Sequence, residues 1–305
     1  MRVVYYPSKT SFKPIKKAVV TIGVFDGLHK GHILLLKTVL RYAKRIKGKS
    51  VVITLWPHPQ KEKLIYPISQ RLNFLERLGI DFCFVLKFNQ ILKNISAKKF
   101  IEEILLKITN PRYIIVGRNF RFGKNALGDI ELLKKFSLRY RFTVKAISPL
   151  KINNKIISST YLRSLLKKGK IEELNRYLHF PFRIFGRVIK GEGRAKILGF
   201  PTANLLVENE ILPNFGVYIV KVRFLNRVYP AVCYIGTKPT FRKNNKKNVS
   251  IEVHIPNFKN SLYRKNLEVE FIKKLRPQRR FLGTLKLIER IKKDVEISQQ
   301  FFPHH

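Results

Sequence analysis

The sequence predicts an α/β domain with a doubly wound parallel sheet, followed by a smaller antiparallel β-barrel or sandwich with a closing helix. Three observations carry this prediction. Residues 18–150 alternate between apolar runs of strand length and helical patterns, as in βαβ units. From about residue 182, short strand patterns dominate and turn signals separate them. The length of 305 residues is about twice that of a typical domain. Two domains are therefore expected, 1–181 and 182–305.

The first domain is predicted to alternate strands and helices along the chain. Its strand candidates are nearly continuous runs of Val, Ile, Leu and Phe, which is typical of strands covered on both faces. Strands are expected at 19–22, 51–55, 82–86, 113–116 and 142–147, and helices at 33–46, 70–78, 97–108 and 130–136. Parallel sheets of this kind bind ligands at the carboxyl ends of their strands. The loops that follow these strands are therefore the first place to look for a site.

The second half of the chain begins with a helical segment and then changes to strands. Residues 158–178 predict two short helices split at Gly169, with Ser158 and Ser159 as N-cap candidates. Strands are expected at 182–189, 216–224, 227–235, 250–255 and 267–275. A closing amphipathic helix is expected over Thr284–Ile297, because its apolar residues fall on one face.

The charge of the chain is strongly basic, with 62 Lys and Arg against 19 Asp and Glu, a net charge of +43. Such a balance suggests a polyanionic partner, either nucleic acid or a phosphate-rich small molecule. The basic residues are spread along the chain and form no run of six like charges. A lysine-rich composition is therefore the favoured explanation, and nucleic acid is not an expected partner.

The chain is expected to be a reduced, cytoplasmic protein without a membrane partner. The apolar fraction of 45% excludes a disordered chain. No apolar stretch reaches the roughly 18 residues of a membrane span, and the first residues lack the apolar core of a signal peptide. Cys83 and Cys233 lie far apart, and on their own they form neither a disulfide framework nor a zinc site.

A glycine-rich turn carries the strongest chemical signal. The first strand ends in T-I-G-V-F-D-G-L-H-K-G-H at 21–32 and leads into a helix. Glycines let the backbone turn tightly and approach a ligand, and the N-terminus of the helix suits a phosphate. His29 and His32 are three residues apart, so both can face one ligand and donate to phosphate oxygens during nucleotidyl transfer. Asp26 is one of only four aspartates, and it has two interpretations, a turn former or a site residue.

This turn resembles the nucleotidyltransferase superfamily, and G-x-F-D-G-x-H-x-G-H is similar to the FMN adenylyltransferase module of prokaryotic bifunctional riboflavin kinase/FAD synthetases. Further agreement comes from W-P-H-P at 56–59, L-G-I-D at 78–81, F-R-F-G at 120–123 and I-S-S-T-Y-L-R at 157–163. The resemblance implies a Rossmann-like fold in which His29, His32 and Arg163 stabilise charge on the ATP phosphates. An arginine fork and hydroxyls at a helix start suit phosphate oxygens. The binding residues it implies are Gly23, Phe25, Asp26, Gly27, Gly31, Asn119, Arg121, Ser158, Ser159 and Thr160.

The segment G-E-G-R-A-K-I-L-G-F-P-T-A-N-L at 191–205 resembles riboflavin kinase through P-T-A-N. Thr202 and Asn204 are two apart, so in an extended segment they point the same way. Hydroxyl and amide oxygens suit Mg²⁺ held jointly with ATP phosphates. In I-E-V-H-I at 251–255, the resemblance implies that Glu252 is the general base that takes the proton of the riboflavin 5′-hydroxyl. The ATP-binding residues it implies in this module are Gly191, Lys196, Gly199, Pro201 and Arg276.

Four departures from the family pattern concern ATP affinity and loop geometry. Ala195 and Lys196 stand where the family usually has Gly-Arg, and lysine keeps the charge without the bidentate fork. Asn119 replaces a carboxylate, Arg264 replaces a glycine, and Trp56 begins the W-P-H-P segment. None removes a residue assigned to chemistry, and the loss of one of the two activities stays open.

The resemblance spans roughly residues 18–297, with both modules in the expected order. It predicts FAD synthesis from riboflavin, with ATP, riboflavin and FMN as small-molecule substrates. The second domain would phosphorylate riboflavin to FMN with ATP and Mg²⁺. The first would then transfer AMP from ATP to the FMN phosphate, which is already ionised and needs no base, and release pyrophosphate.

Two alternatives stay open. One is a nucleotidyltransferase that acts on another phosphate with the first domain alone, and P-T-A-N with Glu252 argues against it. The other is a basic nucleic-acid-binding protein, which predicts tight and steeply salt-dependent binding.

Overall fold

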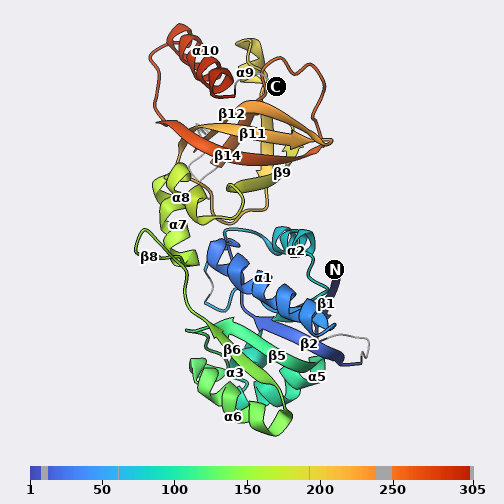
Figure 1. Ribbon diagram of the computed structural model, residues 1–305. Helices are drawn as coiled ribbons and strands as arrows, with labels where there is room; N and C mark the ends of the chain where they lie inside the picture. Colours follow the sequence, from blue (N-terminus) through green and yellow to red (C-terminus); the bar gives the residue numbers. More distant parts are fainter. Residues whose placement is uncertain (8–12, 61, 192, 238–248, 303–305) are drawn as a thin grey trace. The chain divides into compact units, whose positions relative to one another are not determined.

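The computed structural model consists of two compact units, Met1–Ser159 and Thr160–His305 (Figure 1). It describes residues 1–7, 13–60, 62–191, 193–237 and 249–302, without the side chains of Arg194 and Lys196. Within these ranges, no helix is both long and apolar enough to cross a membrane. The division places most of α7 (Ser159–Lys168) and all of α8 (Ile171–Tyr177) with the second unit. The domain boundary between 181 and 182 stays a prediction.

The first unit is built on a six-stranded parallel sheet of order β1-β4-β3-β2-β5-β6. The five predicted strands are confirmed as β2 (Ile15–Ile22), β3 (Lys49–Trp56), β4 (Phe82–Lys87), β5 (Thr109–Gly117) and β6 (Thr143–Ile147). β1 (Arg2–Tyr6) was not expected, because it precedes the βαβ alternation and pairs with β4 at the edge of the sheet. The central strands carry the apolar runs because both of their faces are buried.

Helices cover this sheet and complete its core. α1 (Lys30–Arg45), α2 (Ile68–Arg77) and α6 (Ile130–Tyr140) confirm three predicted helices. The fourth, predicted over 97–108, is α4 (Ala97–Lys99), a π-helical stretch over Phe100–Leu105 and α5 (Leu106–Ile108). The shorter elements are α3 (Gln90–Asn94), a 3₁₀ turn at Lys124–Ala126, and the small hairpin β7 (Lys151–Ile152) and β8 (Lys155–Ile156). Ile53, Phe84 and Ile114 are fully buried in the core.

The second unit is a closed antiparallel barrel of order β10-β13-β12-β11-β14-β9, which confirms the predicted barrel. Its strands are β9 (Arg183–Ile189), β10 (Ala203–Val207), β11 (Gly216–Phe224), β12 (Arg227–Thr237), β13 (Val249–His254) and β14 (Asn266–Pro277). α9 (Arg194–Ile197) lies between β9 and β10. The predicted closing helix is α10 (Thr284–Phe301), which packs on β12 and β11 (Figure 1). There the Ser298 hydroxyl donates to the Ala231 carbonyl at 3.2 Å.

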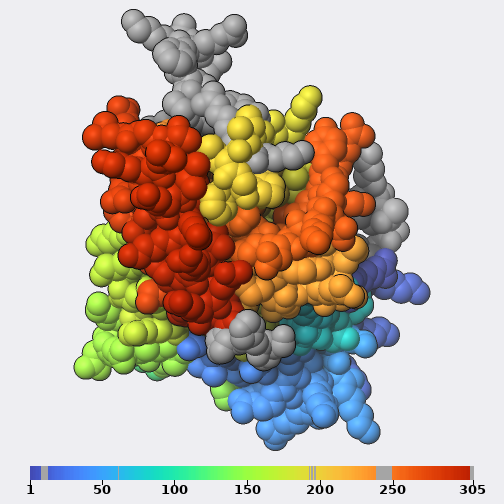
Figure 2. Space-filling model, turned by 90° about the horizontal axis from the view of Figure 1, so that it is seen from above, coloured from blue at the N-terminus to red at the C-terminus, as the bar shows by residue number. Residues whose placement is uncertain are grey.

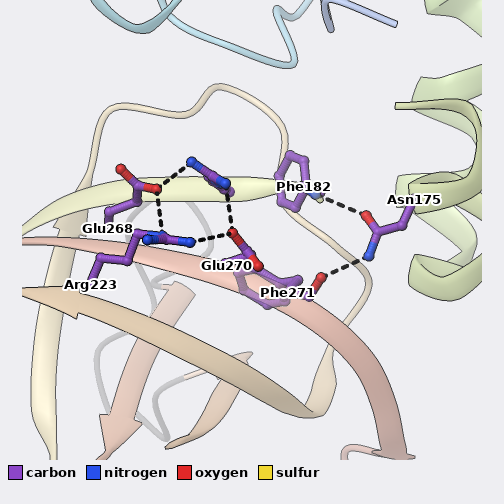
Figure 3. A network of polar contacts seen from close by, with 7 residues as sticks. Asn175, Phe182, Arg223, Glu268, Glu270 and Phe271 are labelled. Atoms are coloured by element: carbon purple, nitrogen blue, oxygen red, sulfur yellow. Dashed lines mark hydrogen bonds and ion pairs between the residues drawn. The ribbon is translucent and has the colours of Figure 1, made fainter. Parts of the chain in front are cut away.

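The Asn175 amide of α8 bonds to two backbone groups of the second unit, one of them on β14 (Figure 3). Asn175 donates from Nδ2 to the Phe271 carbonyl at 2.9 Å and accepts at Oδ1 from the Phe182 N–H at 2.8 Å. Beside it, the buried Arg183 guanidinium pairs with Glu268 at 2.6 Å and with Glu270 at 2.7 Å. Such buried pairs are costly to break, because the remaining charge is left without compensation.

Candidate active sites

In the first unit, the glycine-rich turn brings two histidines into ring contact at the start of α1. His29 is the N-cap of this helix, and its Nδ1 accepts from the His32 N–H at 3.2 Å. The two imidazoles stack with their centroids 3.6 Å apart, and Phe25 meets His32 edge-on at 5.4 Å. A Cβ at Gly31 would lie 3.2 Å from the His29 ring, so glycine leaves room for this close approach.

His29 is buried and His32 is partly buried, and desolvation keeps both imidazoles neutral at pH 7. It lowers the pKa of His29 from 6.5 to about 4 and the pKa of His32 well below 6.5. Because Nδ1 of His29 accepts a hydrogen bond, its proton is assigned to Nε2, which is then a donor. Nδ1 of His32 is buried and has no hydrogen-bond partner within the part of the chain that the structure describes. The pair therefore offers neutral imidazole groups to an anion.

The Asp26 carboxylate is tied to the protein backbone. It is 1% exposed and accepts from the N–H groups of Ile65 and Tyr66 at 2.9 and 3.3 Å. The backbone carbonyl of Asp26 accepts a hydrogen bond from the Ser159 hydroxyl at 2.9 Å, and this bond holds Ser159 next to the turn. The contacts favour the turn-holding interpretation of Asp26. The nearby Gly27 has a φ of 79°, which glycine adopts readily.

The buried Arg71, which the sequence did not single out, hydrogen-bonds to the backbone of the same turn. The Arg71 guanidinium donates to the Val24 carbonyl at 2.5 Å, and the Thr54 hydroxyl donates to that carbonyl at 3.2 Å. The available signal was weak. Arg71 is a charged residue within the predicted helix at 70–78, and charged residues are usually found on the surface of a protein. Gly23 completes this region by donating to the Ile53 carbonyl at 3.0 Å.

The remaining predicted residues of the first site are more scattered. Asn119 is exposed after β5, and Arg121 pairs at 2.9 Å with Asp129, the N-cap of α6. Ser158 directly precedes α7. Thr160 and the buried Arg163 lie on α7 within the second unit, so their role beside His29 and His32 stays a prediction.

In the second unit, a cavity of about 360 Å³ opens between the barrel, the segment around α9 and α10. In Figure 2, α10 (red) lies beside the yellow segment around residues 194–200, and both contribute to the lining. Its apolar wall includes Phe200, Val217, Leu287 and Ile291, and its polar groups include Thr202, Glu252 and Arg276. An apolar cavity with a few polar groups is typical of a small-molecule site.

The Glu252 carboxylate is held at both of its oxygens. Glu252 on β13 pairs with Asn204 on β10 and with Tyr234 on β12. The Thr202 hydroxyl donates to Oε2 at 3.3 Å, and the Ser250 hydroxyl donates to Oε1 at 2.9 Å. A carboxylate has about four acceptor positions, so these two bonds leave capacity to accept a proton.

Thr202 and Asn204 carry the oxygen donors that Mg²⁺ prefers. A Cβ at Gly191 would overlap the Asn204 amide, so glycine lets β9 and its following loop approach this side chain closely. The residues that the structure describes contain no cluster of three or more His, Cys, Asp or Glu side chains able to hold a metal. The donor set of Thr202 and Asn204 fits an ion whose other ligands are water and nucleotide phosphates.

Among the other predicted residues of this unit, Arg276 lines the cavity. Arg276 donates to the buried Asp294 of α10 at 2.8 and 2.9 Å, which holds the guanidinium at the wall. The Pro201 carbonyl lies 2.9 Å from Nδ1 of His254. Gly199 has a φ of 86°. The Lys196 side chain lies outside the described part of the chain.

Two departures from the family pattern have a structural counterpart. Arg264 has a φ of 64°, so it adopts the left-handed conformation that the usual glycine would take, which costs about 1 kcal/mol. Ala195 is part of the helical turn α9 and needs no such conformation.

Comparisons with known proteins agree with this division into two units. A family model described as FAD synthetase matches residues 12–161, and one described as riboflavin kinase matches residues 178–302. Three curated relatives are named bifunctional riboflavin kinase/FMN adenylyltransferase. The one from Buchnera aphidicola subsp. Schizaphis graminum is 39% identical over 93% of this chain and 94% of the relative. The one from Bacillus subtilis is 34% identical, with 94% and 93% covered, and the one from Escherichia coli K12 is 30% identical, with 95% and 94% covered.

A solved structure from Streptococcus pneumoniae, described as a macrolide-efflux protein, has a TM-score of 0.89 at 26% identity and covers 98% of this chain and 99% of its own. The two family models and the curated relatives agree on one family. The chain belongs to the bifunctional riboflavin kinase/FMN adenylyltransferase family.

Proposed function

We propose how the residues of the two units divide the reactions of this family. The chain makes FAD from riboflavin: the riboflavin kinase module forms FMN, and the FMN adenylyltransferase module converts FMN to FAD. The structural observation that carries the residue assignment is the Glu252 carboxylate, which two hydroxyls hold on the wall of an apolar cavity.

In the kinase step, Glu252 accepts the proton of the riboflavin 5′-hydroxyl as that oxygen attacks the γ-phosphorus of ATP and ADP leaves. The apolar wall of Val217, Leu287 and Ile291 suits the flat flavin ring. Thr202 and Asn204 would hold Mg²⁺ through their side-chain oxygens, and the ion would supply positive charge that offsets the charge on the ATP phosphates. Since the Thr202 hydroxyl donates to Glu252, its lone pairs remain available for the ion.

In the transferase step, an oxygen of the FMN phosphate attacks the α-phosphorus of ATP and pyrophosphate leaves. The FMN phosphate is already ionised, so no general base is required. His29 donates from Nε2 to the ATP phosphates, beside the N-terminus of α1, whose dipole favours an anion. His32 supports the His29 ring by stacking. The family motif further assigns Arg163 to the phosphates, where a guanidinium fork binds two oxygens.

The proposed partners are small molecules, namely ATP, riboflavin and FMN, and the proposed compartment is the cytoplasm. The test is to incubate the purified protein with riboflavin, ATP and Mg²⁺ and to separate the flavins by chromatography. FMN and FAD are the expected products, with none formed when ATP is omitted. A folded protein that forms neither flavin would contradict the proposal.

A further inference from the structure

Ser250 contacts the proposed general base from behind the cavity wall. It lies on β13, two residues before Glu252, so both side chains point to the same face of the strand. Its hydroxyl donates to Oε1 of Glu252 at 2.9 Å, and the residue is 3% exposed. Among the described residues, Glu252 lines the cavity and Ser250 does not. Ser250 can therefore act on the reaction only through another side chain.

β12 lies beside Ser250 in the barrel. Gly236 pairs with Ser250, and Tyr234 pairs with Glu252. A Cβ at Gly236 would fall on the Tyr234 phenol, so this ring lies across the glycine beside Ser250. Burial and the negative charge of Glu252 raise the pKa of Tyr234, so the phenol stays neutral at pH 7. A neutral aromatic ring therefore lies over the cross-strand partner of Ser250.

We propose that Ser250 is a positioning residue that fixes the plane of the Glu252 carboxylate for riboflavin phosphorylation. The terminal torsion of a glutamate side chain is broad, so packing alone does not set this plane. Donors on both oxygens set it: Ser250 on Oε1 and Thr202 on Oε2. The oxygen next to Thr202 is then presented to the substrate hydroxyl, where a small misplacement lowers the rate strongly. This inference rests on the proposed role of Glu252.

The first test compares Ser250→Ala, which removes the donor, with Ser250→Thr, which keeps it. In Ser250→Ala we expect the kcat of FMN formation to fall about tenfold, the scale of one hydrogen bond to a charged group. The KM for riboflavin should change less than about twofold, because Ser250 does not line the cavity. Ser250→Thr should retain kcat within about threefold of the wild type. Equal losses in both variants, or a loss confined to KM, would overturn the proposal.

The decisive test repeats Ser250→Ala in a Glu252→Gln background. If Ser250 acts through the carboxylate, the second substitution lowers the residual rate less than about twofold, because coupled residues are not additive. A full tenfold loss in that background would mean that Ser250 acts by another route, and the proposal would fail. Conversion of supplied FMN to FAD by each preparation, together with its melting temperature, checks that the protein is folded.

The remaining outcomes separate the role of Ser250 from the proposed function. Should Ser250→Ala not fold, Ser250→Cys preserves the size with a much weaker donor, and it should show the same tenfold loss of kcat. A wild-type protein that makes no FMN, or a Glu252→Gln variant that makes it at the wild-type rate, would refute the proposed function itself. Normal behaviour of these two proteins, with Ser250→Ala as active as wild type, would refute the role of Ser250 alone.

Discussion

His29 accepts a hydrogen bond at Nδ1 from the backbone N–H of His32 at 3.2 Å, and this one contact defines what the histidine pair can do. It caps α1 and directs the remaining proton of His29 to Nε2. Since burial also keeps both rings neutral, His29 is a hydrogen-bond donor over the whole physiological pH range. The same geometry therefore serves the stability of the helix and the binding of phosphate.

Substitution of His29 should separate the two activities. We expect His29→Asn to lower conversion of FMN to FAD at least about a hundredfold, because the Nε2 donor is lost. Asparagine is itself a good N-cap, so the stability of α1 is preserved, whereas His29→Ala should cost about 1 kcal/mol of unfolding free energy as well. Steady-state rates of FAD and FMN formation provide the measurement. If His29→Asn abolished FMN formation in a folded protein, the assignment of the modules would be wrong.

Burial of His29 also predicts how stability depends on pH. Its pKa is 6.5 when exposed and about 4 in the folded protein, so the unfolded chain binds more protons between these values. The unfolding free energy should therefore decrease as the pH falls from about 6.5 to about 4, by about 3 kcal/mol from His29 alone. Urea unfolding can be followed through Trp56, the chain's one tryptophan, which lies on β3 of the first unit. In His29→Asn the decrease should be correspondingly smaller, and an unchanged pH dependence would contradict this account.

Removal of the proposed general base should impair FMN formation and spare the conversion of FMN to FAD, the reverse of the effect expected for His29. In Glu252→Gln we expect FMN formation to fall about 10²–10⁴-fold, the usual contribution of a general base. Glutamine keeps the size of the side chain, and its one amide oxygen can accept from one of the two hydroxyls while its NH2 group donates to the other. Conversion of supplied FMN to FAD should stay at the wild-type rate, measured on the same preparation. A loss of less than about threefold in FMN formation would exclude Glu252 as the base.

The metal assignment predicts a dependence on both the ion and the Thr202 hydroxyl. A chelator should abolish FMN formation, and added Mg²⁺ should restore it. Thr202→Ala should raise the Mg²⁺ concentration needed for the half-maximal rate, while Thr202→Ser, which keeps the oxygen, should leave it nearly unchanged. Titration of Mg²⁺ at fixed ATP is the measurement. Equal Mg²⁺ curves for Thr202→Ala and wild type would place the ion elsewhere.

Asn175 provides a prediction about stability. Asn175→Ala leaves the Phe182 N–H and the Phe271 carbonyl without their partner, and we expect it to lower the unfolding free energy by about 2 kcal/mol. Asn175→Asp keeps the acceptor for Phe182 and should lose less. Denaturant unfolding followed by circular dichroism compares the variants. A wild-type midpoint for Asn175→Ala would show that the amide does not fasten α8 to the barrel.

The sequence was informative where local pattern and tertiary structure agree. The buried runs that form β2, β3 and β4 are recognisable because burial on both faces requires uninterrupted apolar residues. β10 was recognised only as the P-T-A-N motif, because a five-residue strand carries little periodicity of its own. The π-helical stretch at Phe100–Leu105 keeps the apolar composition of an ordinary helix, so composition could not distinguish it.

In both sites, the sequence identified the reactive residues but not the residues that hydrogen-bond to them. The glycine-rich motif singled out His29 by residue type and spacing, and the family resemblance singled out Glu252, but their hydrogen-bond partners depend on the fold. Arg71 reaches the carbonyl of Val24, 47 residues away, and no local signal records that distance. Asp26 stood out by its rarity, yet its carboxylate meets the backbone of a loop about 40 residues further on. Ser250 lies in an ordinary strand position, and only the register of the barrel brings it behind the base.

One chain carries two separable reactions, and one set of assays tests this separation. Wild type, His29→Asn and Glu252→Gln are each incubated with ATP and Mg²⁺, once with riboflavin and once with FMN, and the flavins are separated over time. We predict FAD from both substrates for wild type, FMN without FAD from riboflavin for His29→Asn, and FAD only from supplied FMN for Glu252→Gln. Loss of both reactions in either folded variant would contradict the account.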